Sequence, residues 1–294
     1  MDDLYAKAGV IAAEVMDAGL EKIGSGVKLL DVAEFVEKLT VEKGAVTAFP
    51  CNISINDRAA HYTPVADDKT VFSEGDLVKL DLGVHVEGHI ADIAKSVAVD
   101  EGSNDLIKAS EKALETAIGM IMPGINTSDL GARIEETIKD AGFLPISNLT
   151  GHKLAMYNLH GGMIIPNVKT THSDTINEGD VLAIEPFATD GAGRVVDEND
   201  ALIFKYLSDR PLRMKESRTI LNFAKSNYGT LPFAERWISD LVPKFKLNSA
   251  LRQLAYSKAI YAYHILRDKD RGTVSQAEHT IRVTSDGCEV LTRR

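Results

Sequence analysis

The chain has 294 residues, of which 44% are hydrophobic and 26% charged, and its formal net charge is −10. This length can bury a substantial core, but an acidic chain without a cluster of lysines and arginines is excluded as a typical nucleic-acid-binding protein. No stretch approaches the ~18 consecutive apolar residues that a membrane span needs. The two cysteines, Cys51 and Cys288, cannot build a disulfide framework and suit the reducing cytoplasm, where we expect the protein to reside.

The first hundred residues predict two helices followed by a β-hairpin. Apolar residues recur at helical spacing over the first forty-odd positions, and Gly24-Ser25-Gly26 divides that stretch into two helices. A turn-rich segment spans residues 44–68. Strands are predicted at 76–84 and 90–99, and a turn near Glu87-Gly88 would pair them.

The middle of the chain predicts two more helices, at 103–122 and from about 127 to 142, with Gly142 as the C-terminal cap. A strand is expected at 180–187. Residues 207–268 show helical periodicity, interrupted at 228–233. The chain is expected to end in strands at 278–283 and 289–292.

One sequence pattern occurs twice at matched spacing. Glu74-Gly75-Asp76 precedes a strand in which an acid, Asp81, lies five residues after Asp76. Glu178-Gly179-Asp180 precedes a strand in which Glu185 lies five residues after Asp180. Such a repeat predicts an α+β domain built from two related halves, with a pseudo-twofold axis and a site on that axis.

Four acidic residues lie in segments that otherwise suit a buried strand: Asp81, Asp92, Glu185 and Glu278. An ionised carboxylate is buried only when it is neutralised, paired or bound to metal. A buried ion pair with lysine or arginine could explain any one of them. For several such acids in one acidic chain, a shared cation is the simpler explanation. The hairpin would place Asp81 and Asp92 on one face of adjacent strands.

Three of the eight histidines stand out as candidate ligands or substrate contacts. His152 and His160 are flanked by glycine, which lets backbone or substrate approach closely, and His61 lies in a turn rich in small residues. Carboxylates with imidazole and no nearby cysteine suit two divalent ions such as Mn, Fe(II), Co or Zn, and argue against a structural zinc site.

Over essentially its whole length the chain resembles type 2 methionine aminopeptidases, which have the pita-bread fold. Any one matching segment would be weak evidence, but all occur in the family's order. They are Phe49-Pro50 with Asn52, Ser54-Ile55-Asn56, the runs 59–64, 79–83, 90–92, 149–152, 158–162, 165–167 and 183–187, and Glu278-His279-Thr280-Ile281.

The resemblance implies a role for each site residue. The five metal ligands would be Asp81, Asp92, His152, Glu185 and Glu278, with Asp92 and Glu278 bridging two ions. Glu185 would also accept a proton from the metal-bound water that attacks the methionine carbonyl. His61 would contact the substrate and help to stabilise the tetrahedral intermediate, and His160 would bind substrate. Phe49 and Leu159 would line the methionine side-chain pocket.

The helical segment 207–268 makes the resemblance one to type 2 enzymes, as an insert within a single catalytic domain spanning residues 1–294. Eukaryotic members carry a long charged N-terminal extension, whereas here the first predicted helix begins almost at once, so we expect an archaeal protein. Cys51, which follows Phe49-Pro50, is expected to be a small filler rather than a nucleophile.

The implied function is removal of the N-terminal methionine from nascent polypeptides whose next residue is small. One alternative is a proline dipeptidase or Xaa-Pro aminopeptidase, because those enzymes share the fold and the five ligands. Another is a non-catalytic relative that binds RNA or the ribosome, but such relatives lose ligands and gain basic tails. Nascent N-termini are the expected partners, with the ribosome as a further candidate. Neither a membrane nor a specific nucleic acid is expected, and the protein is expected to be a monomer.

Overall fold

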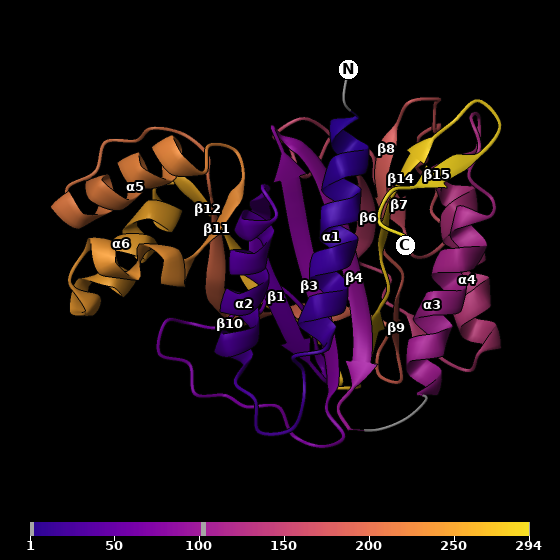
Figure 1. Cartoon of the computed structure of the whole chain (residues 1–294), viewed down its shortest axis with the longest axis horizontal. Helices are drawn as coiled ribbons and strands as arrows, with labels where there is room; N and C mark the ends of the chain where they lie inside the picture. Colours follow the sequence, from indigo (N-terminus) through magenta and orange to yellow (C-terminus); the bar gives the residue numbers. More distant parts are fainter. Residues whose placement is uncertain (1–2, 101–103, 294) are drawn as a thin grey trace.

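The computed structural model describes residues 3–100 and 104–293, which form two α/β halves side by side and a third lobe at one end (Figure 1). In the first half, two helices cover one face of an antiparallel sheet with the strand order β1-β3-β4. Its elements are α1 (Leu4–Leu20), α2 (Leu29–Glu42), β1 (Val46–Ile55), β3 (Leu77–Val86) and β4 (His89–Ala98).

The break between the two helices of this half lies where the sequence predicts it, at residues 24–26. The Asp3 side chain accepts a hydrogen bond from the backbone N–H of Ala6 and so caps α1. The turn between α1 and α2 contains Gly26 at φ +81°, a conformation that glycine adopts without strain. The apolar face of α1 packs on β3 and β4 and that of α2 on β1, with Met16, Val36 and Leu80 in one core.

The predicted hairpin is confirmed as β3 and β4. Val86 pairs with His89 across a two-residue turn in which Glu87 has φ +50° and Gly88 has φ +86°. Two successive positive φ values match the turn type whose twist suits a two-residue hairpin. The turn therefore fixes the register of both strands.

The second half repeats this arrangement. Two helices pack on a five-stranded sheet with the order β15-β14-β8-β6-β7, and a small sheet of order β13-β9-β5 continues from it. The predicted helix start at residue 103 lies outside the described residues. The elements are α3 (Asp105–Ile118), α4 (Thr127–Asp140), β5 (Leu144–Pro145), β6 (Thr150–Leu154), β7 (Ile164–Pro166), β8 (Val181–Ile184), β9 (Phe187–Thr189), β13 (Val274–Gln276), β14 (His279–Val283) and β15 (Cys288–Val290).

The repeated Glu-Gly-Asp pattern forms the same turn in both halves. Gly75 and Gly179 each have φ +84°. The carboxylate of Asp76 accepts the backbone N–H three residues earlier at 2.8 Å, and that of Asp180 does the same at 2.9 Å. Each glycine N–H also donates to the carbonyl of a valine, either Val99, just after β4, or Val283, the last residue of β14. The two halves predicted from this repeat are therefore confirmed by matching turns.

The third lobe contains most of the insert, and its helices stand away from the two halves (Figure 1). Its strands form a sheet of order β11-β10-β12-β2, and its helices share a core with that sheet. The elements are β2 (Arg58–Ala60), β10 (Val195–Tyr206), α5 (Lys215–Asn227), β11 (Pro232–Ala234), the 3₁₀ helix η1 (Glu235–Leu241), α6 (Lys244–Tyr256) and β12 (Ile260–Asp268).

The prediction of helical structure up to residue 268 is wrong for its last part, because residues 260–268 are strand β12. No glycine or proline marks the turn that leads into this strand. Instead, Lys258 adopts φ +56°, which is rare for a residue with a side chain. β12 pairs with β10 and β2 and so ties the insert to the segment before His61. No helix within the described residues is long and apolar enough to cross a membrane.

Candidate metal centre

A cavity of about 230 Å³ contains every site residue that the sequence analysis identified. Its walls come from β1, β3, β4 and β6, from the segments around residues 159–160, 185 and 278, and from strands of the third lobe. Its lining residues are Phe49, Asn52, Ala60, His61, Asp81, Asp92, Asn148, Leu149, Thr150, His152, Leu159, His160, Glu185, Phe187, Ile203, Pro232, Tyr263 and Glu278.

The hairpin places two of the carboxylates on one face of the first sheet, as predicted. Asp81 pairs with Ala94, and Asp92 pairs with Gly83. Since side chains alternate along a strand, Asp92 and Ala94 point to the same face, and Asp81 shares that face. Gly83 also leaves room for the Phe49 ring, which would lie 2.2 Å from a Cβ at this position.

The two glutamates lie at breaks between strands rather than inside strands, which corrects the expected spans 180–187 and 278–283. Glu185 lies between β8 and β9, and Glu278 lies between β13 and β14. The pairing of His279 with Ile184 brings these breaks together. The backbone N–H of Glu278 donates to the carbonyl of Ala94 at 2.9 Å, which joins the second half to the hairpin of the first.

His152 completes the cluster from strand β6. Its Nε2 lies 3.7 Å from Oδ2 of Asp92 and 3.7 Å from Oε1 of Glu185. Asp92, His152 and Glu278 present ligand atoms that all lie within 4.8 Å of one another, and all three side chains are buried. Strands from both halves therefore converge on one point.

Several polar atoms of this cluster are buried without a hydrogen-bond partner among the described residues. They are Oδ1 of Asp81, Oδ1 of Asp92 and Nδ1 of His152. Buried polar atoms of native proteins are nearly always paired, so a group of orphans in one place requires an explanation. A cation would take up the lone pairs of both aspartates.

Burial raises the pKa values of all four carboxyl groups, and repulsion between carboxylates raises three of them further. Burial raises the pKa of Asp81 to about 7. The pKa values of Asp92, Glu185 and Glu278 lie well above the ordinary range, first because of burial and then because of the neighbouring carboxylates. Burial lowers the pKa of His152 to about 3, so this imidazole is neutral at pH 7 and can donate a lone pair to a metal.

The residues therefore fit divalent cations. Carboxylates and a neutral imidazole are the ligands of Mn, Fe(II), Co and Zn in catalytic sites, and a positive charge relieves the repulsion among the acids. The free cysteines do not compete for this role, since neither Cys51 nor Cys288 lines the cavity. Cys51 is buried and its thiol pKa is raised by burial, in accord with the expected filler role.

Tyr263 brings the two other histidines of the cavity together. Its ring packs edge-on against His61 at 5.4 Å and stacks with His160 at 6.5 Å between centroids, and His160 lies 4.6 Å from the ring of His152. Sequence reasoning missed Tyr263 because it assigned this part of the chain to a helix. The alternation of Tyr261 and Tyr263 about Ala262 was the available signal for a strand.

Gln276 is a second residue that sequence reasoning missed. Its Nε2 donates to Oε2 of Glu185 at 3.3 Å and lies 3.5 Å from Oε2 of Glu278. Its backbone N–H donates a hydrogen bond to the Ser96 hydroxyl of the hairpin strand β4. Gln276 thus orients two carboxylates from outside the cluster, a contact that only the folded structure reveals.

Replacing Gly151 by alanine should destabilise the protein and disturb the cluster. The new Cβ would lie 2.4 Å from the carbonyl oxygen of Ala183, so β6 must move away from β8 and carry His152 from Glu185. We expect a loss of ~1–3 kcal/mol in the free energy of unfolding, measured by urea denaturation. Gly24→Ala is the control, because a Cβ there meets nothing within 4 Å. Equal stability of both variants would contradict this account.

Fold and cluster together define a metallopeptidase, and comparison of sequences agrees. The model of metallopeptidase family M24 matches residues 3–205, more than two thirds of the chain. The chain belongs to this family, and the family implies a divalent metal. The chain is 50% identical to a methionine aminopeptidase of Thermococcus kodakarensis, over 99% of this chain and 100% of the relative. It is 48% identical to a methionine aminopeptidase of Methanocaldococcus jannaschii, over 98% of this chain and 97% of the relative.

Solved structures show how widely the fold is shared. A thermophilic Arx1 matches with a TM-score of 0.86 at 19% identity, over 98% of this chain and 89% of that one. A methionine aminopeptidase of Thermotoga maritima matches with a TM-score of 0.72 at 24% identity, over 98% of this chain and 95% of that one. A prolidase of Pyrococcus furiosus matches with a TM-score of 0.64 at 20% identity, over 99% of this chain and 63% of the prolidase. The predicted pita-bread fold is thereby confirmed.

Proposed function

We propose that this protein is a metal-dependent aminopeptidase that removes the N-terminal methionine from polypeptides, with a preference for a small second residue. The observation that carries the proposal is full-length identity of 50% to methionine aminopeptidases. The chain has four carboxylates and one histidine that converge in one cavity, which supports a catalytic rather than a purely structural role. The substrates would be nascent polypeptides in the cytoplasm, and we expect a monomer.

Five residues would hold two divalent ions: Asp81, Asp92, His152, Glu185 and Glu278. Ions of Co, Mn, Fe(II) or Zn bound there would supply Lewis acidity to a water nucleophile and to the scissile carbonyl. Glu185, whose carboxylate lies 3.7 Å from Nε2 of His152 and lines the cavity, would also accept the proton of that water.

His61 is proposed to bind the scissile peptide through Nε2. Its Nδ1 lies 3.0 Å from the carbonyl oxygen of His264, which can only accept, so Nδ1 carries the proton. Burial lowers the pKa of His61, which keeps the ring neutral at pH 7. The neutral ring then has a lone pair on Nε2, which would accept a hydrogen bond from the N–H of the scissile peptide rather than donate one to the oxyanion.

The methionine side chain is proposed to lie between Phe49 and Leu159. Both residues line the cavity and belong to one apolar cluster with Leu231 from the third lobe. His160, beside Tyr263, is proposed as a second polar contact to the substrate. An apolar pocket discriminates by only ~1–3 kcal/mol per methylene, so other unbranched side chains should be weak substrates.

A direct assay distinguishes methionine removal from proline-specific cleavage, since a prolidase shares the fold. The metal-loaded protein should release methionine from Met-Ala-Ser and leave an Ala-Pro peptide intact, as followed by chromatography of the products. Cleavage of the proline peptide alone would overturn the proposal. If neither peptide is cleaved and Asp81→Ala changes nothing, a non-catalytic binding protein becomes the better explanation.

A further inference from the structure

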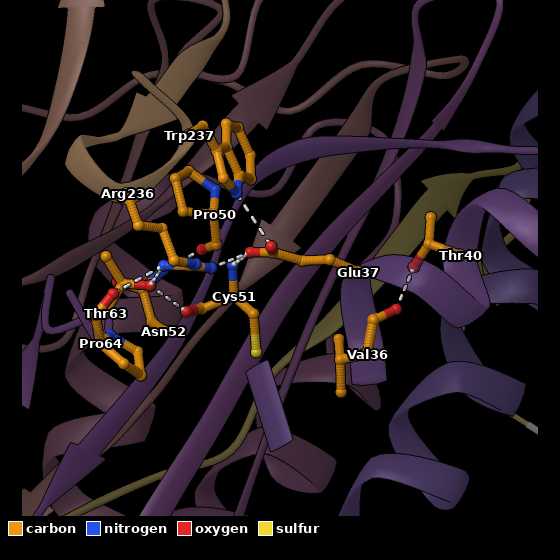
Figure 2. A network of polar contacts seen from close by, with 10 residues as sticks. All are labelled: Val36, Glu37, Thr40, Pro50, Cys51, Asn52, Thr63, Pro64, Arg236 and Trp237. Carbon is orange, nitrogen blue, oxygen red and sulfur yellow. Dashed lines mark hydrogen bonds and ion pairs between the residues drawn. The ribbon is translucent and has the colours of Figure 1, made fainter. Parts of the chain in front are cut away.

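A buried ion pair connects the insert to the first half of the molecule, outside the metal centre. Arg236 of η1 pairs with Glu37 of α2, and their side chains are only 4% and 14% exposed. Figure 2 shows both side chains beside residues 50–52, in the middle of β1, with Arg236 also reaching the segment that follows His61. Removing two charges from water costs several kcal/mol per ion, so such a pair is weak evidence for stability alone.

The Glu37 carboxylate also accepts hydrogen bonds from two groups that belong to different elements. It accepts the backbone N–H of Cys51 at 3.1 Å and the indole Nε1–H of Trp237 at 2.9 Å. The carboxylate therefore holds β1 at the position that follows Phe49-Pro50, and it holds the insert through Trp237 (Figure 2). These contacts fix where the Arg236 guanidinium lies.

The other side of the Arg236 guanidinium forms hydrogen bonds with the segment that follows His61. Its Nη1 donates to the hydroxyl of Thr63 and to the carbonyl of Pro64, the latter at 3.1 Å. The Thr63 hydroxyl in turn donates to the carbonyl of Cys51 at 2.7 Å. One planar guanidinium thus joins α2 to residues 63–64, an arrangement that the single ammonium of lysine cannot reproduce.

The backbone at His61 needs such support. His61 has φ +65°, a conformation that costs a residue with a side chain ~1–3 kcal/mol and persists only where surrounding contacts impose it. On one side the His61 ring is held by the carbonyl of His264 in β12. Downstream, the Tyr62 carbonyl accepts the N–H of Ile53 at 2.8 Å, and Arg236 binds the next two residues.

We propose that Arg236, oriented by Glu37, is a positioning residue that holds His61 in the strained conformation from which it meets the substrate. The proposal rests on the role proposed for His61 above. It makes the insert part of the catalytic machinery, because two of the supports of His61, Arg236 and the His264 carbonyl, come from the insert.

Kinetics in two backgrounds test this proposal. Arg236→Lys keeps the charge but loses the forked geometry, and it should lower kcat/KM for Met-Ala-Ser by about 10- to 100-fold, because small misplacements of a contacting group cost this much. In a His61→Ala background the same substitution should cost less than about 3-fold, since the group it positions is absent. A loss of equal size in both backgrounds would overturn the proposal.

Lys244→Met is the matched control. Lys244 and Asp67 form a second ion pair between the insert and the segment after His61, but both side chains are largely exposed. Exposed pairs contribute little, so this variant should keep wild-type kinetics. If His61→Ala itself leaves kcat/KM unchanged, the proposed role of His61 fails, and the next measurement still decides the positioning role of Arg236.

Imidazole ¹⁵N NMR of the metal-free protein reports the position of His61 without any assay of activity. In the wild type and in Lys244→Met, Nδ1 of His61 should carry the proton that it donates to His264. In Arg236→Lys the spectrum should show a mixture of tautomers, because the ring leaves the carbonyl. An unchanged His61 signal would overturn the proposal. Should Arg236→Lys fail to fold, Glu37→Gln takes its place with the same expected change.

Discussion

Replacing Asp92 by asparagine should lower peptidase activity by more than about 100-fold, the upper end of the loss seen when a group that only supports a metal ligand is removed. Asp92 is 3% exposed, and its carboxylate lies 3.7 Å from Nε2 of His152. An amide is nearly the same shape as a carboxylate, but it carries no charge to hold a cation. Activity would be measured on Met-Ala-Ser at saturating Mn²⁺ or Co²⁺.

The same substitution should leave the metal-free protein at least as stable as the wild type. Burial raises the pKa of Asp92, and the Asp81 carboxylate raises it further, so ionising Asp92 opposes folding. The backbone of Asp92 exchanges two hydrogen bonds with the Thr280 hydroxyl, at 2.7 and 2.8 Å, and asparagine keeps both. We expect its Tm at pH 8 without metal to equal or exceed that of the wild type by a few degrees.

Thermal unfolding with and without added metal checks both expectations. Metal should raise the Tm of the wild type and leave that of Asp92→Asn nearly unchanged. Asp140→Asn is the control, because Asp140 is exposed at the end of α4 and its substitution should change neither quantity. A metal-induced rise in Asp92→Asn equal to that of the wild type would remove Asp92 from the metal centre.

The spacing of acids along the sequence predicted much of this centre, because the hairpin and the repeat act through local geometry. The eleven-residue separation of Asp81 and Asp92 determines their common face once the turn at Glu87-Gly88 is recognised. The repeated Glu-Gly-Asp turn determines the position of Glu185 in the same way. The assignment of His152 as the ligand among three candidate histidines came from family resemblance and not from spacing.

Contacts between distant segments were not predictable in this way. The strand character of residues 260–268 was hidden by a turn that uses Lys258 rather than glycine, so Tyr263 was absent from the expected site. The pairing of Glu37 with Arg236 joins residues 199 apart in sequence. No pattern in the sequence links the two positions, so only the folded chain brings them together.

The pKa values of the centre lead to the last prediction, that metal binding releases protons and weakens steeply as the pH falls. The pKa of Asp81 is raised to about 7, and those of Asp92, Glu185 and Glu278 lie well above their ordinary values. The metal-free centre therefore retains protons near pH 6 that a cation must displace. For each proton displaced, the apparent Kd should rise about 10-fold per unit fall in pH.

A rise in pH strengthens metal binding but lowers the stability of the metal-free protein. Between the ordinary carboxyl pKa and the raised value, the folded state binds more protons than the unfolded state, so metal-free stability falls as the pH rises through the raised pKa values. Bound metal removes this loss, because it neutralises the ionised carboxylates. The metal-induced rise in Tm should consequently grow between pH 5.5 and pH 7.5.

Titration calorimetry in two buffers of different ionisation enthalpy measures the released protons directly. At pH 6 the apparent enthalpy of Mn²⁺ binding should differ between the buffers by at least the difference between their ionisation enthalpies, which corresponds to one released proton. Asp92→Asn should reduce this difference. His152 contributes no proton, since its pKa of about 3 leaves it neutral throughout this range. Identical enthalpies in both buffers would mean that the four carboxyls are already ionised without metal, and that another positive charge compensates their repulsion.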